Sequence, residues 1–148
     1  MAIKRDDFPL PDIDDALTAP YFAGAARGKL VIPRCETCGA FVWYPAETCP
    51  TDACSSSGGA LMWTPVSGRG TLFSWAVVQR PFLPAFADMV PFVTALVAID
   101  EDPAVRLCTL LVDHDELAAE MPLVVDFRPL AFSTVPGKSV VVPMFRPA

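Results

Sequence analysis

Four of the five cysteines lie close together in the chain and form two pairs. Two residues separate Cys35 from Cys38, and Gly39 follows; four residues separate Cys49 from Cys54. Thiolates spaced in this way can bind one ion, and the glycine permits the tight turn that directs backbone amides at sulfur. The pattern predicts a closed structural Zn²⁺ site with Cys35, Cys38, Cys49 and Cys54 as ligands. An iron–sulfur cluster or thiols without metal are the alternatives.

Few other side chains have the chemistry of a catalyst. The one histidine, His114, lies between two aspartates and could transfer protons, but no nucleophile is near it in the sequence, which favours a solvated turn. Cys108 lies within an expected strand, where we expect a buried, inert thiol. The segment 68–70, Gly-Arg-Gly, is too short to cradle a phosphate and indicates a strand corner or bulge. These residues favour a protein that is not catalytic by itself.

The composition excludes several classes of protein. The chain has 148 residues, enough for one domain or two very small ones, and 53% of them are hydrophobic. The longest strongly apolar run, Met89 to Ile99, has 11 residues, whereas a membrane helix needs roughly 20. Sixteen prolines disfavour long helices and are typical of short strands and rigid loops. The composition therefore argues against a helix bundle, a membrane helix and a disordered chain.

The charge balance argues against a nucleic-acid partner. The formal net charge is -6, the pI is about 4.6, and Lys4-Arg5 is the one adjacent pair of basic residues. The amino terminus has no apolar segment of the kind that a secretory signal carries, so we expect a cytoplasmic protein. An odd number of cysteines in a reducing compartment then argues against a disulfide framework.

The first thirty residues predict one short helix, or two, before the β-rich part. Asp12, Asp14 and Asp15 could cap a helix start, and Gly28 is a plausible end. Helical spacing places four apolar side chains on one face: Leu17, Tyr21, Phe22 and Ala25. This face could pack on its own domain or on a partner, and the sequence leaves both open.

The rest of the chain predicts short strands separated by Gly, Pro and Asp residues, after a joint at 55–60. The expected strands are 61–66, 71–78, 92–99, 105–112, 123–130 and 140–145. Residues 113–119 look like a helical turn between two of them. Five or six such strands are typical of a small barrel or sandwich.

Several segments, taken in order, resemble one known family. They are 21–30, Arg34–Gly39 with 44–45 and 49–50, 67–75, 91–93 and 142–147. This order resembles the zinc-ribbon plus OB-fold proteins associated with acyl-CoA metabolism, catalogued as domain of unknown function thirty-five. The resemblance covers residues 17–147. One departure is the spacing of Cys49 and Cys54, because family members usually have two intervening residues there.

The resemblance implies a mainly β fold in three parts. They are an N-terminal helical segment over 1–29, a rubredoxin-like zinc ribbon over 30–58, and a C-terminal OB-fold barrel over 59–148. Family members act as partner subunits of thiolase-superfamily enzymes, including thiolases and lipid-transfer-protein-like aldolases. Others are fused or bound to hotdog-fold enoyl-CoA hydratases. In actinobacterial steroid side-chain degradation, a retro-aldolase acting on a β-hydroxyacyl-CoA needs such a domain, and the partner carries the catalytic residues.

This function leads to two sets of candidate residues. A CoA site needs cations near apolar walls, and Arg69 and Arg80 flank an expected strand. A partner could cover the helix face and the apolar, proline-rich loop at 80–92, which could instead fold back on the barrel as a plug. The interface candidates are Leu17, Tyr21, Phe22, Phe82, Phe86 and Met89.

The sequence analysis therefore favours a non-catalytic, zinc-binding OB-fold subunit of a thiolase-like or aldolase partner, with an acyl-CoA substrate shared between them. A single-stranded nucleic-acid-binding module is a different class, since both folds serve that role, and the acidic charge weighs against it. An enzyme in its own right would have His114 as its one imidazole.

Overall fold

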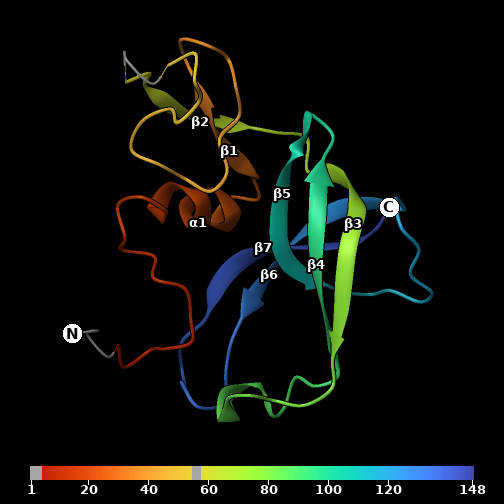
Figure 1. The fold of residues 1–148 in the computed structure, drawn as a ribbon. Coiled ribbons are helices and arrows are strands. Elements are labelled where there is room, and N and C mark those ends of the chain that lie inside the picture. The colour runs from red at the N-terminus through yellow and green to blue at the C-terminus, as the bar shows by residue number, and fades with distance from the viewer. Residues whose placement is uncertain (1–4, 55–57) are drawn as a thin grey trace.

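The computed structural model describes residues 5–54 and 58–148, which form one short helix, a two-stranded sheet and a five-stranded barrel (Figure 1). The N-terminal elements are α1 (Ala19–Ala26), β1 (Val31–Cys35) and β2 (Leu61–Pro65). The barrel strands are β3 (Arg69–Val78), β4 (Phe92–Ile99), β5 (Asp102–Leu111), β6 (Pro122–Leu130) and β7 (Val140–Pro147). A 3₁₀ turn, η1 (Pro84–Phe86), lies in the connection between β3 and β4.

The barrel closes in the order β3-β4-β5-β7-β6. The neighbours β3–β4, β4–β5 and β6–β7 pair antiparallel over most of their lengths, whereas β5 and β7 run parallel and meet at one pair, Leu111 and Phe145. Three pairs between β3 and β6, at 69–71, complete the closure. This is the strand order of the five-stranded OB-fold, so the expected fold class is confirmed.

Alternation along the strands builds the barrel core. In β4, Val93, Ala95 and Val97 are buried, while the residues between them are half-buried. Their register partners across the sheet include Leu107 and Leu111, which are also buried. Apolar residues on one face of each strand therefore meet inside the barrel, as period-two patterning requires.

The Gly-Arg-Gly segment forms the expected corner, because two of its positions have no room for a side chain. Gly68 has φ +78, and a Cβ there would lie 2.4 Å from Val125 Cγ1. A Cβ on Gly70 would lie 2.4 Å from the carbonyl oxygen of Ala98. The register irregularity occurs further along β3, between Leu72 and Ser74. The glycines thus let β3 cross closely over β4 and β6.

The helix is single and short, and the aspartates do not cap it. Thr18 is the N-cap, without a side-chain hydrogen bond, and the side chain of Asp15 accepts a hydrogen bond from Leu17 N in the preceding turn. Gly28, with φ +70, follows the helix end. Gly24 allows close packing on β1, because a Cβ there would lie 2.9 Å from Val31 Cγ2. Helix α1 contacts both β1 and β7 (Figure 1).

Two sequence-based expectations about local structure differ from the fold. Residues 113–119 form bends rather than a helical turn, and Asp113 has φ 49 and pairs with Arg128 of β6. The strand expected at 61–66 pairs with β1 instead of joining the barrel. Both errors have one cause: short segments take their conformation from long-range partners that sequence pattern does not reveal. Part of the joint expected at 55–60, residues 55–57, lies outside the described residues.

Among the described residues, no helix has the length and apolar character needed to cross a membrane.

We expect Phe145→Ala to destabilise the chain by about 3–5 kcal/mol, because Phe145 is fully buried where β5 and β7 meet. Urea unfolding followed by tryptophan fluorescence measures the change. Phe82→Ala is the matched control: Phe82 is 96% exposed, and its removal should alter the free energy of unfolding by less than about 0.5 kcal/mol. Equal effects of the two substitutions would contradict this description of the core.

Candidate metal centre and apolar surfaces

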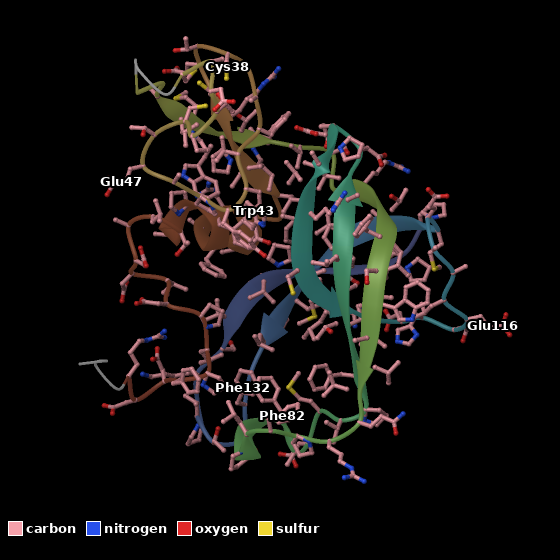
Figure 2. All side chains as sticks on the ribbon, viewed as in Figure 1. Cys38, Trp43, Glu47, Phe82, Glu116 and Phe132 are labelled. Atoms are coloured by element: carbon pink, nitrogen blue, oxygen red, sulfur yellow. The ribbon has the colours of Figure 1, made fainter. Side chains whose placement is uncertain are left out.

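The four paired cysteines converge on one point in space. Their sulfur atoms all lie within 4.8 Å of one another, and the Sγ atoms of Cys35 and Cys54 are 3.7 Å apart, as are those of Cys38 and Cys49. Four sulfurs bound tetrahedrally at about 2.3 Å from one ion lie roughly 3.8 Å apart. The observed separations therefore fit one ion at the centre of the four thiols. Figure 2 shows Cys38 in the loop region above β1 and β2.

Tight turns and a close backbone approach place these sulfurs. Cys35 ends β1, and its amide donates a hydrogen bond to Ala40 O, while Gly39 N donates to Cys35 O. Gly39 has φ +74, which favours glycine at this turn. Gly59 approaches from the other side, where a Cβ would lie 2.8 Å from Cys35 Sγ and 3.1 Å from Cys54 Sγ. The cluster thus requires a glycine at 59.

Hydrogen bonds and burial make the four thiols unequal. The Thr51 hydroxyl and the Ala40 amide lower the pKa of Cys38 to about 6, and this thiol is exposed. Backbone amides of Cys38 and Thr37 lower the pKa of Cys35. Burial raises the pKa of Cys54 to about 12. Since metals bind thiolates, Cys38 is ready to bind at neutral pH, whereas Cys54 must lose a proton as the ion binds.

The histidine considered for catalysis, His114, is half-buried, and its Nδ1 lies 3.2 Å from the carbonyl oxygen of Asp115, in the bent segment after β5. Cys108 is exposed, so the expectation of a buried thiol was wrong. Alternation in β5 directs Leu107 into the core and Cys108 to the opposite face.

The two candidate CoA-binding arginines lie at opposite ends of β3. Arg69 begins this ten-residue strand and Arg80 follows its end by two residues, so a strand length of roughly 33 Å separates them. Both side chains are exposed. The structure therefore does not bring them together into one site.

The candidate interface residues of the helix divide into covered and exposed positions. Tyr21 packs on the ribbon, with its ring 5.3 Å from that of Trp43, and burial raises its pKa. Phe22 is half-buried against Tyr21, and Leu17 is 38% exposed. Part of the helix face thus packs on its own chain.

The loop between β3 and β4 divides in the same way. Phe86 and Met89 pack into a second small core with Leu10, Val135 and Phe132, and the rings of Phe86 and Phe132 are 5.2 Å apart. Phe82 is 96% exposed. Figure 2 shows Phe82 and Phe132 at the end of the barrel opposite to the cysteines. Half of this loop therefore closes the barrel end, and half remains outside.

One apolar hollow adjoins this loop, a second lies between α1 and the barrel strands, and Thr94 lines both. The first, of about 280 Å³, is lined by Val78, Pro81, Phe82, Leu83, Phe86, Phe92 and Thr94. The second, of about 320 Å³, is lined by Pro11, Tyr21, Phe22, Thr94, Cys108, Thr109, Leu110, Leu130, Val142, Pro143 and Met144. We refer to these two hollows, which share one lining residue, as the apolar trough.

The sequence analysis missed this trough, although β4 carried a signal for it. Residues 92–99 are apolar at nearly every position, whereas a strand with one face in solvent alternates apolar and polar residues. The pattern therefore indicates apolar surface on both faces of this strand.

Comparisons with known proteins agree with this architecture. Family models described as "ChsH2, rubredoxin-like zinc ribbon domain" and "ChsH2, C-terminal OB-fold domain" match residues 22–58 and 63–128. A "Probable enoyl-CoA hydratase alpha subunit" of Thermomonospora curvata is 33% identical over 132 residues, covering 86% of this chain. The match covers 36% of that relative, so the chain spans about a third of its length.

Two solved structures share the fold. The "Ltp2-ChsH2(DUF35) aldolase" superposes with a TM-score of 0.74 at 29% identity, covering 93% of this chain and 98% of that one. A protein of unknown function from the DUF35 family of Sulfolobus solfataricus superposes with a TM-score of 0.52 at 12% identity, covering 90% and 87% of the two chains.

We expect Gly59→Ala to weaken metal binding by at least tenfold, because the added methyl group would push on the sulfurs of Cys35 and Cys54. Competition with a chromogenic chelator measures the affinity. Ala60→Ser is the control, since residue 60 is exposed and its neighbours can accept a hydroxyl. An alanine variant with wild-type affinity would contradict the packing described around Gly59.

Proposed function

The chain belongs to the ChsH2 family of zinc-ribbon and OB-fold proteins, also called DUF35, and we propose that it is a non-catalytic partner subunit of a thiolase-superfamily aldolase or thiolase. The observation that carries this proposal is the superposition on the Ltp2-ChsH2(DUF35) aldolase over 93% of the chain. The reaction would be cleavage of an acyl-CoA, such as retro-aldol cleavage of a steroid side-chain intermediate. The partner supplies the reacting groups.

The proposed role of this subunit is to bind and to orient. Docking can order a partner's active site and enclose a thioester, and such binding energy raises turnover without a catalytic side chain here. Exposed apolar residues support docking, because Phe82 and Leu83 are exposed side by side at an apolar hollow, and contiguous exposed apolar surface is typical of interaction sites. Leu17, which precedes α1, offers a second exposed apolar contact. The proposed interface also includes four partly covered side chains that lie under these contacts: Tyr21, Phe22, Phe86 and Met89.

The acyl-CoA would lie along the apolar trough. Arg80 is exposed and lies in the chain between Val78 and Pro81, which both line the first hollow, so we propose that it binds a phosphate of CoA there. Arg69, at the far end of β3, would need a different part of the ligand or of the partner. The apolar lining suits the acyl chain.

The proposed metal is structural Zn²⁺. Cys35, Cys38, Cys49 and Cys54 would hold it, and the separations of their sulfurs fit tetrahedral coordination. When bound, zinc supplies a cross-link between distant parts of the chain. Four thiolates leave no position for water or substrate, so the residues around the ion hold the ribbon and do no chemistry.

A second candidate partner is an enoyl-CoA hydratase. The relative from Thermomonospora curvata, described as a probable alpha subunit of such an enzyme, contains a region similar to this chain within a protein about three times as long. A hydratase partner would use the same surfaces for docking and would give hydration in place of carbon–carbon cleavage. Activity of the two reconstituted complexes on matched acyl-CoA substrates separates these candidates.

We expect Phe82→Asp to weaken binding to a thiolase-like partner at least tenfold, because burying a carboxylate in an apolar interface carries a large desolvation cost. Co-purification and calorimetry with the purified partner measure the change. Met62→Asp is the control, since Met62 is 56% exposed on β2, far from the loop. If no thiolase-like or hydratase partner binds the wild-type chain, the proposed function fails.

We expect Arg80→Ala to raise the KM for acyl-CoA roughly tenfold in the reconstituted complex while leaving kcat unchanged, because a lost charged hydrogen bond weakens ground state and transition state alike. Steady-state kinetics measure both constants. Arg27→Ala is the control, an exposed arginine at the end of α1. An unchanged KM would remove Arg80 from the binding site.

A further inference from the structure

The two cysteine pairs receive their hydrogen bonds in different ways. In the first pair, two backbone amides, those of Thr37 and Cys38, approach Cys35 Sγ at 3.4 and 3.5 Å. The second pair is wider, with four residues between Cys49 and Cys54. Around it, Cys49 N donates a hydrogen bond to Gly59 O, and Cys54 N donates to Thr51 O.

A side-chain hydroxyl from within the second pair lies beside two of the sulfurs. Thr51 Oγ1 is 3.1 Å from Cys49 Sγ and 3.5 Å from Cys38 Sγ. These two sulfurs come from different pairs and are 3.7 Å apart, so the hydroxyl lies beside both at once. A thiolate can only accept a hydrogen bond, so in the metal-bound state the hydroxyl is the donor.

The backbone holds this hydroxyl in place. The Thr51 carbonyl accepts the hydrogen bond from Cys54 N at 3.0 Å, which closes a turn inside the wide pair. This hydrogen bond fixes the backbone of Thr51 between Cys49 and Cys54. The hydroxyl also lies against Cys38, the exposed thiol of the four.

Charge gives this contact its importance. Four thiolates around one divalent ion carry a net charge of -2, and the sulfurs repel one another at these separations. Hydrogen bonds to ionised acceptors are stronger than neutral ones, and they draw electron density away from sulfur. Groups that support metal ligands in this way typically contribute 10–100-fold to metal affinity.

We propose that Thr51 is a positioning residue of the metal centre. Its hydroxyl donates a hydrogen bond that is shared between the thiolates of Cys49 and Cys38, with Cys49 the nearer, and so stabilises the charge on these two ligands of different pairs. The inference rests on the proposed binding of zinc by the four cysteines. It assigns a function to Thr51 that the ligand pattern alone does not contain.

The test compares Thr51→Val, which removes the hydroxyl at nearly constant shape, with Thr51→Ser, which keeps it. Thr37→Val is the matched control, because the exposed Thr37 lies within the first pair and its backbone amide, which the substitution keeps, approaches Cys35 Sγ. Two quantities are measured on the full chain: zinc affinity by chelator competition, and the sulfur-to-cobalt charge-transfer band after Co²⁺ substitution.

We expect Thr51→Val to weaken zinc binding 10–100-fold and to move the charge-transfer band to lower energy, because the thiolates become more electron-rich. Thr51→Ser and Thr37→Val should stay within about twofold of wild type. A valine variant with wild-type affinity and an unmoved band would overturn the role of Thr51. A valine variant weakened without any band shift would also overturn it, since the loss would then be one of packing.

A second variant guards against a folding failure. Thr51→Ala also removes the hydroxyl, and it carries the same expectations if the valine variant does not fold. Failure of the zinc proposal is distinguishable, because the wild-type chain would then bind neither Zn²⁺ nor Co²⁺ at one ion per chain. Wild-type binding of both ions with an unaffected Thr51→Ala would overturn the role of Thr51 alone.

Discussion

The ribbon depends on its cysteines because three of the four, Cys35, Cys49 and Cys54, are most of its buried core. The cluster of buried residues in this part consists of Cys35, Cys49, Cys54 and Val42, with Ala46 and Leu61 packed against it. Such a cluster buries little apolar area, so hydrophobic packing alone cannot offset the entropy of ordering the loops. A metal cross-link can, since its binding energy becomes folding energy. Strand β1 links the ribbon to the barrel, because its residue Cys35 lies in the ribbon cluster and its residue Ile32 lies in the barrel core.

The barrel has the opposite character and needs no cross-link. Its core unites residues from all five strands with Leu30 and Ile32 from the ribbon side, while Tyr21 and Trp43 cover the junction. The two parts therefore share one continuous apolar interior, and α1 seals it where it contacts β1 and β7. A rigid platform of this kind can present surface loops to a partner at fixed positions. That property suits a subunit that positions its partner and the substrate, while the partner supplies the catalytic groups.

Sequence reasoning reached the fold and the four converging thiols because both rest on local signals. Cysteine spacing and the glycine turns lie within short segments, and the strands of the barrel alternate with period two. It failed where a partner distant in the chain decides. Arg128 of β6 forms an ion pair with Asp113 in a bend, and residues 61–65 pair with β1 and not with a barrel strand. Cys108 lies on the outer face of β5 and is therefore exposed. The contact of Thr51 with Cys38 could not be predicted either, since only folding brings these two residues together.

The high hydrophobic content of this acidic chain now has specific locations. One part fills the barrel, and another fills the small core where Phe86 and Met89 meet Phe132. Other large apolar side chains are exposed at several places on the surface, among them Tyr44, Met62 and Phe73, and the most exposed of them is Phe82, which lies beside the trough with Leu83. Because Phe86 packs in the small core, it fixes the backbone of the loop that carries the exposed Phe82. An apolar side chain held in that way loses little conformational entropy on binding, so the fold favours its burial by another surface.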